Sequence, residues 1–414
     1  MRINSILYFK LLVFFFTLPF LGPIVGLGLL KIALVSKYII SILILFFGKK
    51  IVIYSLEKWY IYLFILVLGL LVYNYSFKVD DIKSFAYFFL ICLEFYIIFK
   101  LSSFFDNNFN DNIYNISKFI VLFITFLNII GIFLIIIGYS GSMDIRHNPF
   151  GPTTMEYSGV FLTTNYATLF SAIGILFSFY ILTVFKKNNV FYFAFLFNFT
   201  SLLLYHSRTQ TLFVVGILLL YMMLKNKKYF IYLLVLILLF ITVNYESVLE
   251  ILDKFLRIQN LIERGILGNR GVLMGYVLDN IQMVGFSGLG LGNARYIWTI
   301  DGVTTSNLST IDIGNMTGLN MHSAIFNYLV ELSILGVFIF YFISIYIYIQ
   351  SSKIKTDSVF ILRLLLLFFM IDSLVNDDIT TLGSPGVIFY ILILSILYGK
   401  IKYSKRKIKH ESYN

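Results

Sequence analysis

The chain has 414 residues, of which 59% are hydrophobic and only 13% are charged, whereas a soluble domain averages about 25% charged residues. A water-soluble fold of this length cannot bury so much apolar surface in one core, and the proline and glycine content excludes a disordered or collagen-like chain. The net charge of +11 falls in short clusters between apolar runs, which is typical of cytoplasmic loops and unlike a nucleic-acid-binding tract. These features predict an integral membrane protein.

A helix needs roughly 20 apolar residues to cross the hydrocarbon core of a bilayer. The apolar runs of this chain predict an all-α fold, a polytopic transmembrane bundle of about twelve spans. The first run is too long for a removable signal peptide and lacks a small-residue cleavage site, so we expect it to be a span. In chain order the predicted spans are residues 6–30, 32–47, 59–77, 82–99, 118–138, 159–185, 190–205, 209–224, 229–245, 322–350, 359–375 and 386–400.

Lysine and arginine residues in alternate loops predict the orientation of these spans. The basic loops, such as Lys186–Lys187 and Lys353–Lys355, are expected to face the cytoplasm, and an even number of spans then places both termini there. The basic tail is expected to lie near anionic lipid. The chain divides into an N-terminal bundle of about nine spans, a large extracytoplasmic loop, the C-terminal spans and the tail, at residues 1–245, 246–321, 322–400 and 401–414.

The large loop is too long to be a simple connection between two spans. Apolar residues at helical spacing within 248–266 and 271–283 predict short helices lying on the outer surface of the membrane. The glycine-rich stretch 288–292 lacks the preceding strand and the following GK[ST] of a phosphate loop, and it lies on the side away from cytoplasmic nucleotides. We therefore expect a turn at which two backbone segments approach closely.

Three residues in this topology share the outer face of the membrane. Arg208 lies in a short turn between two spans, Arg270 begins a predicted helix, and His322 lies at the outer end of the tenth span. Each also has an ordinary interpretation: a snorkelling arginine, a solvated loop charge and a hydrogen-bonded boundary histidine. Together, two guanidinium groups can bind a diphosphate leaving group, and a neutral imidazole can take a proton from an attacking hydroxyl.

No metal or other cofactor is expected to take part in this chemistry. None of the four histidines has a second histidine or a cysteine at ligand spacing, and no HExxH motif is present. Nucleoside triphosphates are cytoplasmic, so an enzyme acting at the outer face needs an energy source that is already in the membrane. An activated lipid would serve.

The sequence resembles the O-antigen ligase and polymerase superfamily over residues 200–340. The resemblance is carried by YHSRTQTLFVVGILLLY, GNRGVLMGYVLDNIQMVGFSGLGLGN and MHSAIFNYLVELSILGVFIF, at 205–221, 268–293 and 321–340. These match the family's Ser-Arg opening a span, its Arg followed by a helix and a glycine turn, and its His opening a later span. The chain departs from the family pattern at Ser323, where Asn is frequent, and at Ser333, where Gly is frequent.

The resemblance implies an inverting, metal-independent glycosyl transfer in a bacterial cytoplasmic (inner) membrane. The donor would be an oligosaccharide linked to undecaprenyl diphosphate, and a protein that regulates chain length is an implied partner. Arg208 and Arg270 would bind the donor diphosphate and His322 would activate the acceptor hydroxyl. Arg264 is a further candidate for phosphate contact, although a solvated helix charge is the simpler interpretation. Glu331 fits a buried structural carboxylate better than a positioning role.

Three alternatives stay open beside an O-antigen or capsule repeat-unit polymerase. One is a non-catalytic scaffold, which the three residues at the outer face disfavour. A ligase would move the finished glycan to lipid A–core. The Phe-, Ile-, Tyr-, Asn- and Lys-rich composition is typical of polymerases from polysaccharide clusters and favours the polymerase. A lipid-linked glycan flippase or another secondary transporter would also have about twelve spans, but it predicts ionisable groups near the bilayer midplane, and these are few here.

Overall fold

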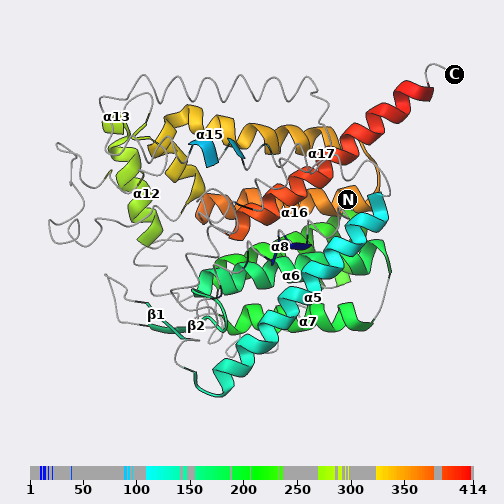
Figure 1. Ribbon diagram of the computed structural model, residues 1–414, viewed down its shortest axis with the longest axis horizontal. Helices are drawn as coiled ribbons and strands as arrows, with labels where there is room; N and C mark the ends of the chain where they lie inside the picture. The colour runs from blue at the N-terminus through cyan, green and yellow to red at the C-terminus, as the bar shows by residue number, and fades with distance from the viewer. Residues whose placement is uncertain are drawn as a thin grey trace.

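The computed structural model describes residues 109–139, 143–146, 154–186, 189–205, 207–232, 269–284, 288–290, 323–376 and 385–411, with isolated positions elsewhere. This part of the chain is a helical bundle with one short β-hairpin (Figure 1). Its elements are α5 (Phe109–Ile136), β1 (Met143–Arg146), β2 (Thr154–Tyr157), α6 (Thr164–Val184), α7 (Asn189–Leu204), α8 (Arg208–Lys225), α12 (Asn269–Asp279), α13 (Ile281–Val284), α15 (Ala324–Ser351), α16 (Asp357–Val375) and α17 (Pro385–Glu411).

Among the described residues, five helices are long and apolar enough to cross a membrane, namely α5, α6, α15, α16 and α17, and α7 and α8 are shorter apolar helices. The chain is therefore a helical membrane protein. These helices coincide with the predicted spans 118–138, 159–185, 190–205, 209–224, 322–350, 359–375 and 386–400. The other predicted spans, 6–30, 32–47, 59–77, 82–99 and 229–245, lie wholly or largely outside the described residues, and the count of about twelve stays a prediction.

The burial of their side chains shows that α17 is central in the bundle and α5 is peripheral. In α17 the membrane-spanning stretch is almost wholly buried, against α6, α15 and α16. In α5 the apolar side chains of Leu122, Phe126, Ile129 and Phe133 are exposed. They recur at intervals of four and three residues and so form one stripe along the helix. Because this stripe is apolar and uncovered, it is the face that α5 offers to lipid.

A buried polar network joins α5, α6 and α7. The side-chain amide of Asn128 donates to Asn198 Oδ1 at 2.8 Å and to Ser171 Oγ at 3.1 Å, and Asn198 donates to Thr125 Oγ1 at 3.0 Å. The Tyr205 hydroxyl donates to Asn128 Oδ1 at 3.3 Å. Hydrogen bonds between helices in a membrane contribute about 0.6–2 kcal/mol each, so this network fixes which faces of the three helices meet.

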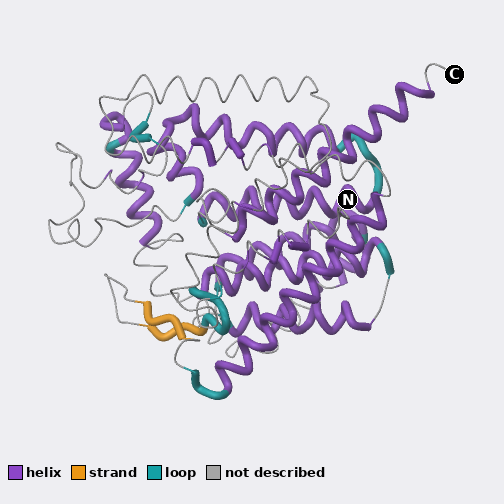
Figure 2. Tube along the Cα trace, viewed as in Figure 1, coloured by secondary structure: helices purple, strands orange, loops and turns teal. Residues whose placement is uncertain are grey.

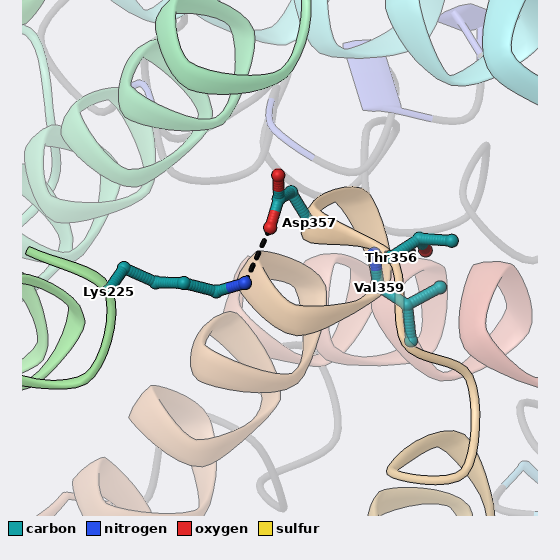
Figure 3. A network of polar contacts seen from close by, with 4 residues as sticks. All are labelled: Lys225, Thr356, Asp357 and Val359. Carbon is teal, nitrogen blue, oxygen red and sulfur yellow. Dashed lines mark hydrogen bonds and ion pairs between the residues drawn. The ribbon is translucent and has the colours of Figure 1, made fainter.

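One end of the bundle is marked by an ion pair between α8 and α16. Lys225 Nζ lies 2.6 Å from Asp357 Oδ1, where α8 ends and α16 begins (Figure 3). Thr356 caps α16 by accepting a hydrogen bond from the Val359 amide. Both charged side chains are well exposed, so the pair contributes at most about 1 kcal/mol. The pair joins the last residue of α8 to the first residue of α16, so the two helices pack antiparallel.

The opposite end of the bundle carries the shorter elements. The β-hairpin, α12 and α13 lie there, away from the C-terminus of α17 (Figures 1 and 2). Strands β1 and β2 pair antiparallel, with Met143 opposite Tyr157 and Arg146 opposite Thr154. The segment lies between the predicted spans 118–138 and 159–185, so the hairpin is an addition to the predicted all-α fold. The strands are four residues each, too short for their alternation to stand out in the sequence.

Candidate functional site

Helix α8 begins at the candidate residue Arg208. Ser207 is its N-cap and accepts a hydrogen bond from the Gln210 amide, while Thr211 Oγ1 donates to the Ser207 carbonyl at 2.6 Å. A serine cap satisfies one of the free amides of the first turn. Arg208 is thus the first residue of a well-capped helix, and its side chain lies outside the described part of the chain.

Helix α12 carries Arg270 as its second residue, and again the side chain lies outside the described part. The sequence predicted a helix over 271–283, and the structure forms α12 and the short α13 across that range. Further along α12, Tyr276 and Val277 are buried against Val330 of α15. This apolar contact fixes the face of α12 that meets the bundle.

Helix α15 begins immediately after His322, at an N-cap that is bound to the end of α16. The Ser323 hydroxyl donates to the Leu374 carbonyl at 2.9 Å and accepts from the Phe326 amide, and the Ala324 amide donates to the Asn376 carbonyl at 3.1 Å. Ser323 therefore fills a capping role that asparagine fills equally well. His322 itself lies outside the described residues, as does Arg264.

The three helix starts share one end of the bundle. Helices α8 and α16 pack antiparallel and have 18 and 19 residues, about 27 and 28 Å at 1.5 Å per residue, so α8 begins level with the end of α16. Helix α15 begins at that same end of α16, and α12 packs on the first part of α15. Helix N-termini carry partial positive charge, so an end where several begin favours an anion.

A buried carboxylate lies close to this end of α16. Asp372 is fully buried, and Asn376 Nδ2 donates to its Oδ1 at 2.5 Å. The Asn376 carbonyl accepts from Ala324, so the carboxylate is linked through one residue to the start of α15. Asp372 was not among the residues predicted from the sequence. The available signal was an acid inside an apolar run, followed one helical turn later by an asparagine.

Helix α15 is broken at Ser333, which the sequence did not predict. Ser333 has φ 60° and ψ −162°, a region populated almost only by glycine and costing other residues about 1–3 kcal/mol. Two backbone carbonyls just before the break accept hydrogen bonds from another segment. The Leu289 amide donates to the Val330 carbonyl and the Gly290 amide to the Glu331 carbonyl, each at 2.9 Å. At about 0.5–1.5 kcal/mol each, these bonds offset much of the strain.

The glycine turn that makes these bonds approaches α15 closely, as the sequence predicted. A Cβ atom on Gly288 would lie 2.3 Å from the backbone carbon and oxygen of Glu331. Gly288 and Gly290 also have φ values of 77° and 92°, which side-chain-bearing residues rarely adopt. Close backbone approach therefore explains Gly288, and the positive φ explains both glycines, without a phosphate-binding role.

No protein-family model matches the chain, and no curated protein matches its sequence. Within the described ranges no group of three histidine, cysteine or acidic side chains could hold a metal ion.

Proposed function

We propose that the protein is a polysaccharide repeat-unit polymerase of the bacterial cytoplasmic membrane. It would transfer a glycan from an undecaprenyl-diphosphate donor to a sugar hydroxyl of a second lipid-linked repeat unit. The resemblance over residues 200–340 supports this activity, and the arrangement of three helix starts supports the site.

The observation that carries the proposal is the common end of α8, α12 and α15. Arg208 and Arg270 lie in the first turns of two of these helices, and His322 directly precedes the third. Two guanidinium groups and several helix N-termini make this end a favourable place for a diphosphate. A histidine beside them supplies the base that a transfer to a hydroxyl requires.

In the proposed reaction the acceptor hydroxyl oxygen attacks the anomeric carbon of the donor sugar, from the face opposite to the diphosphate. A carbon–oxygen bond to the acceptor forms, and the bond to the diphosphate oxygen breaks with inversion at that carbon. The hydroxyl proton goes to His322, and the electron pair of the broken bond goes to the undecaprenyl diphosphate. Arg208 and Arg270 stabilise the charge that develops on this leaving group.

The proposed topology has about twelve spans, both termini in the cytoplasm and the loop 246–321 outside. Two features of the described helices support it. The C-terminus of α17 lies at the same end of the bundle as three lysines, Lys225, Lys353 and Lys355. Helix α12 and the β-hairpin lie at the other end (Figure 1). A polymerase site at the end with α12 would then face the periplasm or cell exterior, where lipid-linked repeat units are joined.

The site is tested by replacing Arg208, Arg270 and His322 singly with alanine in a host that lacks the native gene. We expect each variant to reduce long-chain surface glycan by about 100-fold or more, since each removes a group acting on the transition state. Lys353→Ala, an exposed base at the opposite end, is the matched control and should leave chain length unchanged. Normal long-chain polymer from all three well-expressed variants would refute the assignment.

The same host separates polymerase, ligase and transporter in a Gram-negative cell. Loss of a polymerase leaves single repeat units on lipid A–core, whereas loss of a ligase leaves none. Loss of a flippase leaves lipid-linked units at the cytoplasmic leaflet, where external glycosidases do not reach them. The polymerase proposal requires the first outcome.

A further inference from the structure

The first part of α15 is held between two separate apolar cores. On one side, Tyr328 and Leu332 are buried in the main core of the bundle. On the other side, Val330 is buried in a second core formed with the outer elements. The second core also contains Tyr276, Val277, Val284, Leu289, Ala294 and Ile297.

The break in α15 makes this double contact possible. In an uninterrupted helix the carbonyls of Val330 and Glu331 would accept from the amides four residues later. Next to the break they accept from Leu289 and Gly290, so the turn 288–290 is bonded directly to the helix backbone. Side-chain packing alone leaves two elements some freedom to slide, whereas two adjacent backbone hydrogen bonds fix their register.

We infer that Gly288 is a positioning residue, which lets the turn 288–290 dock on the break in α15 and so holds α12 at a fixed place against the first part of α15. The inference rests on the proposed function, because α12 carries Arg270 in its first turn and His322 directly precedes α15. A misplacement of about 1 Å between groups that act on one substrate can cost about 100-fold in rate. Docking of the turn would therefore set the rate of transfer without touching the substrate.

Gly288 is the position at which this docking can be removed by a single methyl group. A Cβ at this position would lie 2.3–2.5 Å from backbone atoms of Glu331 and Leu332. Because these are backbone atoms, the clash cannot be relieved by the rotation of a side chain. Gly275 in α12 offers a matched control, since a Cβ there would meet nothing within 4 Å. Both changes are glycine to alanine. At Gly288 the new Cβ meets the backbone of α15 and the φ of 77° strains alanine, so both effects act against docking, whereas Gly275 is helical and meets neither obstacle.

The experiment compares Gly288→Ala and Gly275→Ala by two readouts. The first is the distance between spin labels on Leu278→Cys in α12 and Phe338→Cys in α15, both exposed positions, in a Cys92→Ala background in nanodiscs. The second is surface glycan length in the host that lacks the native gene. We expect Gly288→Ala to broaden the distance distribution and to reduce long-chain polymer about ten-fold or more. Gly275→Ala should leave both unchanged.

Three outcomes would overturn the inference. The distances and the polymer in Gly288→Ala could both stay as in the unmodified protein, the distances could broaden without loss of polymer, or the polymer could fall with unchanged distances. If Gly288→Ala does not accumulate, Gly290→Ala replaces it, with the same expectations, because alanine at a φ of 92° strains the residue whose amide donates to the Glu331 carbonyl. The spin-label distances do not depend on activity, so failure of the proposed polymerase reaction would be seen separately, in the arginine and histidine variants.

Discussion

At the scale of single residues, the most informative position is Ser333. The resemblance marked it as a place where the family frequently has glycine, and the structure gives it a backbone conformation that glycine adopts without strain. Its hydroxyl is buried and makes no hydrogen bond with the described residues. The serine side chain therefore gives this conformation no visible support, and the docked turn on the neighbouring carbonyls does.

Ser333→Gly should raise the free energy of unfolding relative to Ser333→Ala. Both variants remove the hydroxyl, but only glycine removes the backbone strain of about 1–3 kcal/mol. Against this gain, the greater conformational entropy of glycine in the unfolded chain costs about 0.5–1 kcal/mol of stability. The expected difference is about 1 kcal/mol in favour of glycine, measured by unfolding in mixed detergent–SDS micelles. Equal stability of the two variants would show that the backbone at this position is not strained.

At the scale of elements, α5 meets the turn that precedes α6 through two glycines. A Cβ on Gly159 would lie 2.9 Å from the Gly131 Cα, and a Cβ on Gly131 would lie 2.9 Å from the Tyr205 hydroxyl. Small residues let helix backbones approach closely in a membrane, where packing rather than the hydrophobic effect drives association. Apolar runs predict the helices, but a run does not indicate which glycine contacts which element.

Gly159→Ala should destabilise the protein more than Gly138→Ala. Both glycines have a positive φ, of 61° and 70°, so the backbone cost of alanine is similar. Gly138 has nothing within 4 Å of a new Cβ, whereas Gly159 faces the backbone of α5. Overpacking costs about 1–3 kcal/mol, so the free energies of unfolding should differ by about 2 kcal/mol. Similar values for the two variants would contradict the close contact.

Two helices extend beyond the spans that hydropathy predicts, because hydropathy locates the apolar part of a helix and not its ends. The predicted span 118–138 became α5, which begins at Phe109, because the polar residues of its first turns are helical without being apolar. Likewise α17 continues past the predicted end of its span at 400 to Glu411, through a stretch with four lysines and one arginine. Lysine and arginine have good helix propensity, so the helix continues beyond the apolar residues that a bilayer can cover.

At the scale of the whole molecule, the described helices have a consistent polarity. The ion pair between Lys225 and Asp357 lies at one end, and the hairpin and α12 lie at the other. The C-terminal basic residues extend α17 beyond the bundle at the first of these ends (Figure 1). Basic residues gathered at one end are what the charge rule associates with the cytoplasmic side.

Sidedness is tested with single cysteines in the Cys92→Ala background. Tyr139 is exposed at the end that carries the hairpin, and Lys353 is exposed at the opposite end. In intact cells a membrane-impermeant maleimide should label Tyr139→Cys and leave Lys353→Cys unlabelled, and both should react after permeabilisation. Labelling of Lys353→Cys in intact cells, with Tyr139→Cys protected, would invert the proposed topology.

The sequence by itself determined the class of the protein and the course of the described spans, because about 20 apolar residues have few stable alternatives to a membrane helix. It also predicted the close backbone approach at Gly288, since glycines of this spacing without a phosphate-loop context indicate a turn. The tertiary structure decided how the helices meet: the break at Ser333, the docking of the turn on α15, the buried pair of Asp372 and Asn376, and the common end of α8, α12 and α15. These depend on hydrogen bonds and van der Waals contacts between residues far apart in the chain, which no local pattern of hydrophobicity records.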